Sequence, residues 1–184
     1  MKTKIAATVL GFLGSTIFAA AALAAPMPGT STSKLVAPQL GLFRSPHGFQ
    51  IGAGDSGWVH GEAPKDSKFI ATVYKSNNAA SKATLTVRVD KLEKDMNIEK
   101  YVQKWMKEYP KYGFDVLGST AFTQNKNRGF VLDLVNRDNA KQHRQVVFLK
   151  NQKAVILTCR DSSDKFKDAL KSCNQIIRTF EWTN

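Results

Sequence analysis

Apolar and polar residues alternate along several short runs of this chain, which is the pattern of half-buried β-strands. In the run over residues 83–90, Leu85, Val87 and Val89 fall on one face and polar residues on the other. The run over residues 69–74 predicts its antiparallel partner, and a shorter strand is expected near residues 49–51. Beyond residue 113, the same pattern predicts four strands at about 114–123, 130–137, 144–150 and 154–159.

The apolar spacing becomes helical in two segments. In the first, residues 98, 101, 102, 105 and 109 are apolar and form one stripe of a helix. Asn97 is suited to cap this helix, and Pro110 with Gly113 predicts its end. In the second segment, the apolar positions 166, 169, 170, 173, 177 and 180 predict the last helix.

These elements follow the order of three strands, a helix, four strands and a second helix. Strands joined by short polar turns pair antiparallel, and amphipathic helices must cover sheet faces. We therefore predict an α+β domain built on a central antiparallel sheet of about six or seven strands, covered by two main helices.

The last strand and the last helix each carry one of the two cysteines of the chain. Cys159 shares a strand face with Val155 and Leu157, and Cys173 lies on the apolar stripe of the following helix. A helix that folds back over its own strand brings these sulfurs together. We predict a disulfide between them, because two cysteines in an exported chain favour a disulfide over a metal site, which needs more ligands.

The first 24 residues have the pattern of a secretory signal peptide. Lys2 and Lys4 precede an apolar, alanine-rich run, and Ala22-Leu23-Ala24 forms a small-x-small cleavage site. The competing interpretation is a membrane anchor, since the run is nearly long enough to span a bilayer. The signal peptide is favoured by the small residues and the cleavage site, so we expect an exported protein, periplasmic or secreted, with no transmembrane span after cleavage.

Residues 25–41 are rich in Pro, Gly, Ser and Thr, which predicts a disordered linker before a single domain over residues 42–184. We expect this domain to be monomeric. The formal net charge of the chain is +12, and removal of the two signal lysines lowers it to +10. Such an excess favours anionic partners, namely lipid head groups, acidic polysaccharide, nucleic acid or an acidic protein face.

Lysines give the surface its clearest geometric pattern. Three lysines of the first predicted helix fall at about 180–240° from Ile98, opposite the apolar stripe. Two more precede the helix and one follows it, although such a stripe is also typical of a plain solvated face. The predicted surface for an anionic partner consists of Lys91, Lys94, Lys100, Lys104, Lys107 and Lys111. A second basic group on the later hairpins consists of Arg137, Lys141, Arg144, Lys150 and Lys153.

Two glycine-rich motifs invite a catalytic or nucleotide-binding interpretation. The segment Gly52-Ala-Gly-Asp-Ser-Gly57 satisfies G-x-G-x-x-G, but the following residues do not predict the helix that a dinucleotide fingerprint requires. Its second half, Gly-Asp-Ser-Gly, resembles the nucleophile loop of chymotrypsin-like proteases, which draw a histidine and an aspartate from a far larger upstream fold. A turn is therefore favoured for the whole segment.

The three histidines give little support for a metal site. His47, His60 and His143 have no ligand spacing, alone or with Asp55 and Glu62, so solvated loop histidines are favoured. Aromatic residues do not interleave with the basic groups, which makes nucleic acid a weak candidate partner. We predict no cofactor and no catalytic residues.

Several short motifs resemble those of a known family. The segment Pro46-His-Gly-Phe-Gln-Ile51, the pair Gly57-Trp58 and the ending Ile176-Ile-Arg-Thr-Phe-Glu-Trp182 are similar to those of the PsbP-like superfamily. This family includes the photosystem II subunit PsbP, DcrB-like envelope proteins and a nuclear-import factor that binds Ran. The resemblance covers residues 42–182. It implies an antiparallel sheet between helices and a binding or assembly role, and it carries over no catalytic residues.

Together these observations predict an exported, non-catalytic binding or assembly protein of the cell envelope or the secreted fraction. Its expected partner is a protein or an anionic surface. Two alternatives stay open: a small secreted hydrolase with an unrecognised site, and a secreted effector that binds a foreign protein.

Overall fold

This computed structural model describes residues 41–94 and 96–183 of the chain. The expected signal peptide over residues 1–24 and nearly all of the expected linker over residues 25–41 lie outside the described residues. Within the described ranges, no helix is both long and apolar enough to cross a membrane.

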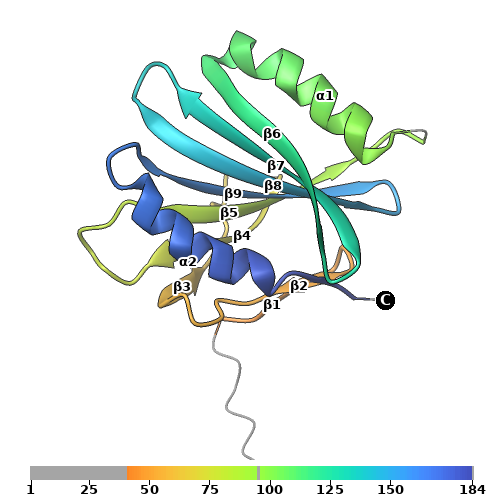
Figure 1. Cartoon of the computed structure of the whole chain (residues 1–184). Coiled ribbons are helices and arrows are strands. Elements are labelled where there is room, and N and C mark those ends of the chain that lie inside the picture. Colours follow the sequence, from red (N-terminus) through yellow and green to blue (C-terminus); the bar gives the residue numbers. More distant parts are fainter. Residues whose placement is uncertain (1–40, 95, 184) are drawn as a thin grey trace, which may run out of the picture. The chain divides into compact units, whose positions relative to one another are not determined.

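Seven strands form one antiparallel sheet, in the order β3-β4-β5-β9-β8-β7-β6 (Figure 1). Tight turns join its central strands, and Asn151 and Gln152 adopt positive φ angles of 49° and 59° in the two-residue turn between β8 and β9. The α+β class and the central antiparallel sheet are therefore confirmed. The strands are β3 (Trp58–Gly61), β4 (Ile70–Ser76), β5 (Thr84–Lys91), β6 (Phe114–Gln124), β7 (Asn127–Asn136), β8 (Lys141–Lys150) and β9 (Lys153–Ser162).

A second, smaller sheet departs from the single sheet that the sequence predicts. It consists of β1 (Phe43–Ser45), β2 (Phe49–Ile51) and β10 (Glu181–Trp182), in the order β1-β2-β10. The strand expected near residues 49–51 belongs to this sheet, because Phe49 and Gln50 pair with the end of the chain. The edge strand of the main sheet next to β4 is instead β3, which the sequence pattern does not predict.

Both predicted helices are present. The first, α1, spans Ile98–Glu108, and its N-cap residue Asn97 accepts the backbone N–H of Lys100 at 2.8 Å. A 3-10 helix, η1 (Tyr109–Tyr112), continues from it and ends at Gly113, whose φ of 79° suits glycine. The second, α2, spans Phe166–Arg178.

The two helices cover opposite faces of the main sheet (Figure 1). Val155, Leu157 and Cys159 of β9 pack in a cluster with residues of α2. Their neighbours Ala154 and Ile156 pack in a second cluster with residues of α1. Successive residues of a strand point to opposite faces, so β9 separates two hydrophobic cores.

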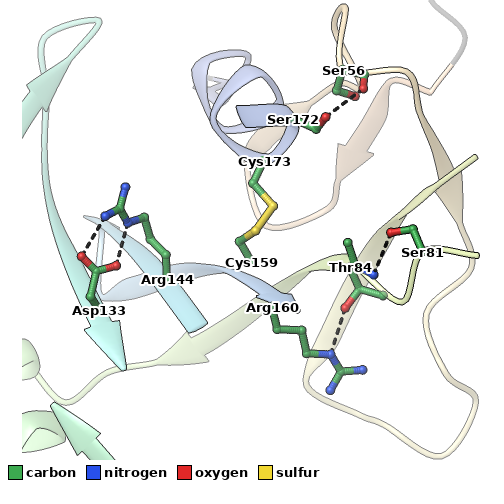
Figure 2. Close-up of a disulfide and its surroundings, with 10 residues drawn as sticks. Ser56, Ser81, Thr84, Asp133, Arg144, Cys159, Arg160, Ser172 and Cys173 are labelled. Carbon is green, nitrogen blue, oxygen red and sulfur yellow. Dashed lines mark hydrogen bonds and ion pairs between the residues drawn. A yellow bond between two sulfur atoms is a disulfide. The ribbon is translucent and has the colours of Figure 1, made fainter. Parts of the chain in front are cut away.

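A disulfide connects the α2 face of β9 to α2 itself (Figure 2). The Cα atoms of Cys159 and Cys173 lie 6.0 Å apart, inside the range that a disulfide requires. Both residues are fully buried. This pairing fits the prediction drawn from the strand and helix periodicities.

Candidate functional site: a groove beside the first helix

A concave groove of about 430 Å³ lies beside α1, where β5 runs into the loop before the helix. We call it the α1 groove. The residue just before β4, the end of β5, the loop that follows β5 and α1 all contribute to it. Its apolar and aromatic lining consists of Phe69, Val89, Leu92, Met96, Tyr101 and Trp105, and its charged lining of Asp90, Lys91, Glu93 and Lys104.

Aromatic side chains are accessible in this groove. Phe69 is 67% exposed, although its backbone carbonyl accepts the N–H of Val89 at 3.2 Å. Trp105 is half-buried and packs at ring-centroid distances of 6.3 Å from Tyr101 and 5.5 Å from Tyr109. An exposed ring on a fixed backbone, beside a concave apolar lining, is characteristic of a binding surface.

A network of three polar side chains lies beneath Trp105. The Tyr101 hydroxyl donates to Asp90 Oδ2 at 2.5 Å, and Arg88 Nη2 donates to the same oxygen at 3.0 Å. The Nε atom of Arg88 is buried at 3.0 Å from Asp90 Oδ1, without the alignment of a hydrogen bond. The Arg88 guanidinium also lies 5.3 Å from the centre of the Trp105 ring, within range of a cation–π interaction.

This network limits the chemistry of the groove. Burial, with a further contribution from the hydrogen bond to Asp90, raises the pKa of Tyr101 above its ordinary value of 10. The hydroxyl therefore stays protonated at neutral pH and keeps donating to Asp90. Since the Asp90 carboxylate already has Arg88 and Tyr101 as partners, it is poorly placed to act as a general base on a ligand. The arrangement suits a fixed binding floor better than catalysis.

The six predicted lysines do not form one patch. Lys91 and Lys104 line the α1 groove. Lys104 lies on the flank of α1, next to Tyr101 and Trp105 in the groove lining. The others do not line it: Lys94, Lys100 and Lys107 are exposed, and Lys111 on η1 has its Nζ 2.8 Å from Glu108 Oε1.

The second basic group is also divided in the structure. Arg137 pairs with Asp115 at 3.3 Å, and Arg144 forms two hydrogen bonds to Asp133, at 2.7 and 2.8 Å. The remaining members lie at opposite ends of the β8–β9 hairpin, with Lys141 at one end and Lys150 and Lys153 at the other.

The glycine-rich segment leads from β2 into β3, so the helix of a dinucleotide fingerprint does not follow it. The prediction of three loop histidines is wrong for two of them. His60 lies on β3, with Nε2 2.6 Å from Thr72 Oγ1, and His143 lies on β8 against the ring of Phe114. Within the described part of the chain, no three His, Cys, Asp or Glu side chains come together as a metal site.

Sequence reasoning missed the aromatic half of the groove. Phe69 belongs to a run that predicts a strand, and Trp105 to the apolar stripe of α1, where core or rim packing is expected, so neither pattern predicts an aromatic groove. Their exposure depends on which end of the sheet the helix leaves open. The α1 helix packs mainly on β7 and β8. At the end of β5, Tyr101 and Trp105 of α1 contact Asp90 and Arg88, while Phe69 at the neighbouring edge stays exposed. The sequence pattern does not predict where on the sheet α1 packs.

Comparison with solved structures identifies the architecture. The solution structure of the cyanobacterial PsbP protein from Synechocystis superposes with a TM-score of 0.57 at 12% sequence identity, over 77% of this chain and 91% of that one. The chain has a PsbP-like fold. A Pseudomonas aeruginosa protein of unknown function has the same architecture, with a TM-score of 0.55 at 14% identity over 75% of this chain and 93% of its own.

These likenesses concern the fold alone, because the sequence identities are low. No protein-family model matches the chain, and no curated protein matches it in sequence. The PsbP-like fold expected from the short motifs is nevertheless the one that the structure has.

Proposed function

We propose that this protein is an exported, non-catalytic binding protein, and that the α1 groove holds an acidic segment of a partner protein. The observation that carries the proposal is the exposed ring of Phe69 beside Lys91 and Lys104 in one concave surface. Neither structural neighbour is described as an enzyme, and this is compatible with a binding role.

The charge of the groove favours an acidic ligand. Neither Lys91 nor Lys104 forms an ion pair within the described ranges. Asp90 is compensated by Arg88, so Glu93 is the one lining carboxylate that opposes the two lysines. The exposed lysines around the groove extend the positive field and would steer an acidic partner toward it.

The shape of the groove favours a polypeptide segment over a membrane surface. Leu92, Met96 and Trp105 are half-buried in the concavity, where a flat bilayer surface does not reach them. An apolar side chain of a bound segment can fill this space while its carboxylates contact the lysines. Such a combination of an apolar anchor and peripheral charges is common in protein interfaces.

Export is the second part of the proposal. Its support is the signal-like pattern of residues 1–24 and the buried disulfide between Cys159 and Cys173. Disulfides of this structural kind persist in oxidising compartments such as the periplasm or the extracellular space.

A photo-crosslinking experiment in the native compartment tests the groove. Benzoylphenylalanine replaces Phe69 in one variant and Tyr112 in the control, since Tyr112 is comparably exposed at 63% on η1. We expect the Phe69 variant to capture a partner through an acidic segment, which mass spectrometry of the cross-linked peptide identifies. Adding Lys104→Glu should abolish this product, and adding Lys107→Glu should leave it.

Three outcomes would contradict the proposal. Equal capture from position 112 would mean that the groove has no special role. Capture that persists with Lys104→Glu would mean that the charge of the groove has no role in binding. Saturable binding to phosphatidylcholine–phosphatidylglycerol vesicles that requires Phe69 would assign the groove to a membrane instead.

A further inference from the structure

A second cavity, of about 390 Å³, lies where β9 ends and α2 begins. It is separate from the α1 groove: Thr84 and Lys91 mark the two ends of β5, about 23 Å apart along the strand, and the cavity lies near Thr84. Four cationic side chains from four segments line it, together with Asp161 and Ser162. The cations are Lys82, Lys141, Arg160 and Lys165.

These cations have no acidic partner in the part of the chain that the structure describes, since none belongs to any of its ion pairs. Asp161 is the one carboxylate in the lining, and its Oδ1 accepts the backbone N–H of Ser162 at 2.8 Å. The four cations and the one carboxylate give the cavity lining a net charge of +3. Like charges gathered in this way repel one another, so an anion in the cavity would relieve an unfavourable arrangement.

Arg160 is held in an orientation that suits an oxyanion. Its Nε donates to Thr84 Oγ1 at 2.9 Å, on the face of β9 opposite Cys159 (Figure 2). The two terminal nitrogens donate to no acceptor among the described residues and remain available. A guanidinium fixed through Nε presents these nitrogens as a fork that binds two oxygens of one phosphate group.

The neighbouring strands place the other cations around this fork. Lys141 lies opposite Ser162 in the β8–β9 pairing, so it shares a sheet face with Arg160, which lies opposite His143. Lys82 follows Ser81, whose Oγ accepts the N–H of Ala83 at 3.2 Å and steadies the loop (Figure 2). Lys165 is the N-cap residue of α2, where the helix dipole adds positive potential.

His143 reports the electrostatics of this region. In the strand pairing it lies opposite Arg160 on β9 and Leu134 on β7, and its ring packs 5.2 Å from the ring of Phe114. Burial first, and then the positive charges of Arg160 and Lys141, lower its pKa to about 4. The histidine therefore sits in the positive field of the cavity, and its titration is sensitive to any anion bound there.

We propose that this cavity is a binding site for a dianionic phosphate group, either free phosphate or a phosphate monoester. The site is independent of the α1 groove and of the partner proposed for it. The Arg160 fork contacts two phosphate oxygens, while Lys82, Lys141 and Lys165 supply the remaining charge. The cavity is larger than one phosphate group, so there is room for the rest of a small ester.

Calorimetric titration of the mature protein at pH 7 tests the proposal, with sodium phosphate and glycerol 3-phosphate as probes and sodium chloride at matched ionic strength as the reference. We expect saturable binding of at least one probe. Lys82→Gln and Arg160→Gln should each weaken it roughly tenfold. Lys150→Gln, at the other end of β8 and about 30 Å from Lys141 along the strand, should leave it unchanged.

The two probes separate the sources of the phosphate group: tighter binding of the ester assigns the site to an esterified ligand, and equal or tighter binding of phosphate assigns it to the free ion. A second readout is the pKa of His143 from its NMR signals, which sulfate, a dianion that does not titrate near pH 4, should raise relative to chloride. Heats that match the chloride reference for both probes would overturn the proposal. So would an equal loss of affinity in Lys82→Gln and Lys150→Gln, because the probes would then sense only the loss of one positive charge. Among the described residues the Lys82 side chain makes no hydrogen bond, so its replacement breaks no contact that holds the site together.

Discussion

Breaking the disulfide should lower the stability of the domain by a predictable amount. Cys159 and Cys173 are 14 residues apart, so the bridge closes a loop of about 15 residues in the unfolded chain. The chain-entropy relation assigns such a loop roughly 3 kcal/mol. For a domain of this size, that corresponds to a fall in melting temperature of roughly 6–12 °C. A folded domain should remain, because both helices keep their apolar contacts with the sheet.

Urea unfolding of the oxidised and the reduced protein measures this difference. The reduced wild type keeps both sulfurs in the core, so it loses the cross-link without a new cavity. The double variant Cys159→Ala/Cys173→Ala loses the cross-link and the packing of both sulfurs, and it should be the least stable of the three forms. Two thiols that titrate in the purified, unreduced protein would refute the reasoning, as would an unfolding midpoint that does not change on reduction.

Two further predictions concern buried polar groups. Burial and the neighbouring cations lower the pKa of His143 to about 4, below the value of about 6.5 in the unfolded chain. The neutral ring therefore contributes its full stability above about pH 6.5, and this contribution is lost as the pH falls to about 4. The difference between these two pKa values corresponds to about 3 kcal/mol, of which we expect about 1–2 kcal/mol because solvent reaches part of the ring. Urea unfolding of the wild type and His143→Gln between pH 7 and pH 4 measures the loss, and the same pH dependence in both proteins would contradict it. In the second core, the Tyr109 hydroxyl donates to Gln145 Oε1 at 2.5 Å in a buried contact. Tyr109→Phe should therefore lower the free energy of unfolding by about 1–2 kcal/mol. The control Tyr112→Phe, on the exposed neighbour, should change it by less than about 0.5 kcal/mol. Equal urea midpoints for these two variants would show that the buried hydrogen bond contributes nothing to stability.

The parts of the fold that the sequence predicts are those with a clear period. Alternation over β5 and helical spacing over α1 and α2 place the correct residues in the two cores. The same periodicities put Cys159 and Cys173 on facing surfaces, which is why their pairing follows from the sequence.

The small sheet could not be predicted, because its strands are too short to have a period. Its pairing joins Gln50 to Glu181, which are 131 residues apart, and the side chains of these two residues also meet at 3.0 Å. Such a contact depends on the main sheet and α2, which bring the ends of the domain together. No local sequence pattern predicts this pairing.

The candidate sites were predicted only in part, for a related reason. The lysine stripe on α1 follows from helical geometry, but the meeting of Lys104 with Phe69 depends on tertiary packing. The second cavity brings together Lys82 from the loop before β5, Lys141 from β8 and Arg160 from β9, and no single segment of the sequence predicts the order of these strands in the sheet.

The most direct test of the proposed function is an affinity measurement with the acidic segment captured at position 69, synthesised as a peptide. Two double variants receive the same change in charge: Lys91→Glu/Lys104→Glu in the α1 groove, and Lys100→Glu/Lys107→Glu outside it. We predict that the groove variant binds the peptide at least about tenfold more weakly than the wild type, and that the other variant stays within about threefold. Equal losses in the two variants would mean that the peptide senses only the overall charge of the protein, which would contradict a binding site in the groove.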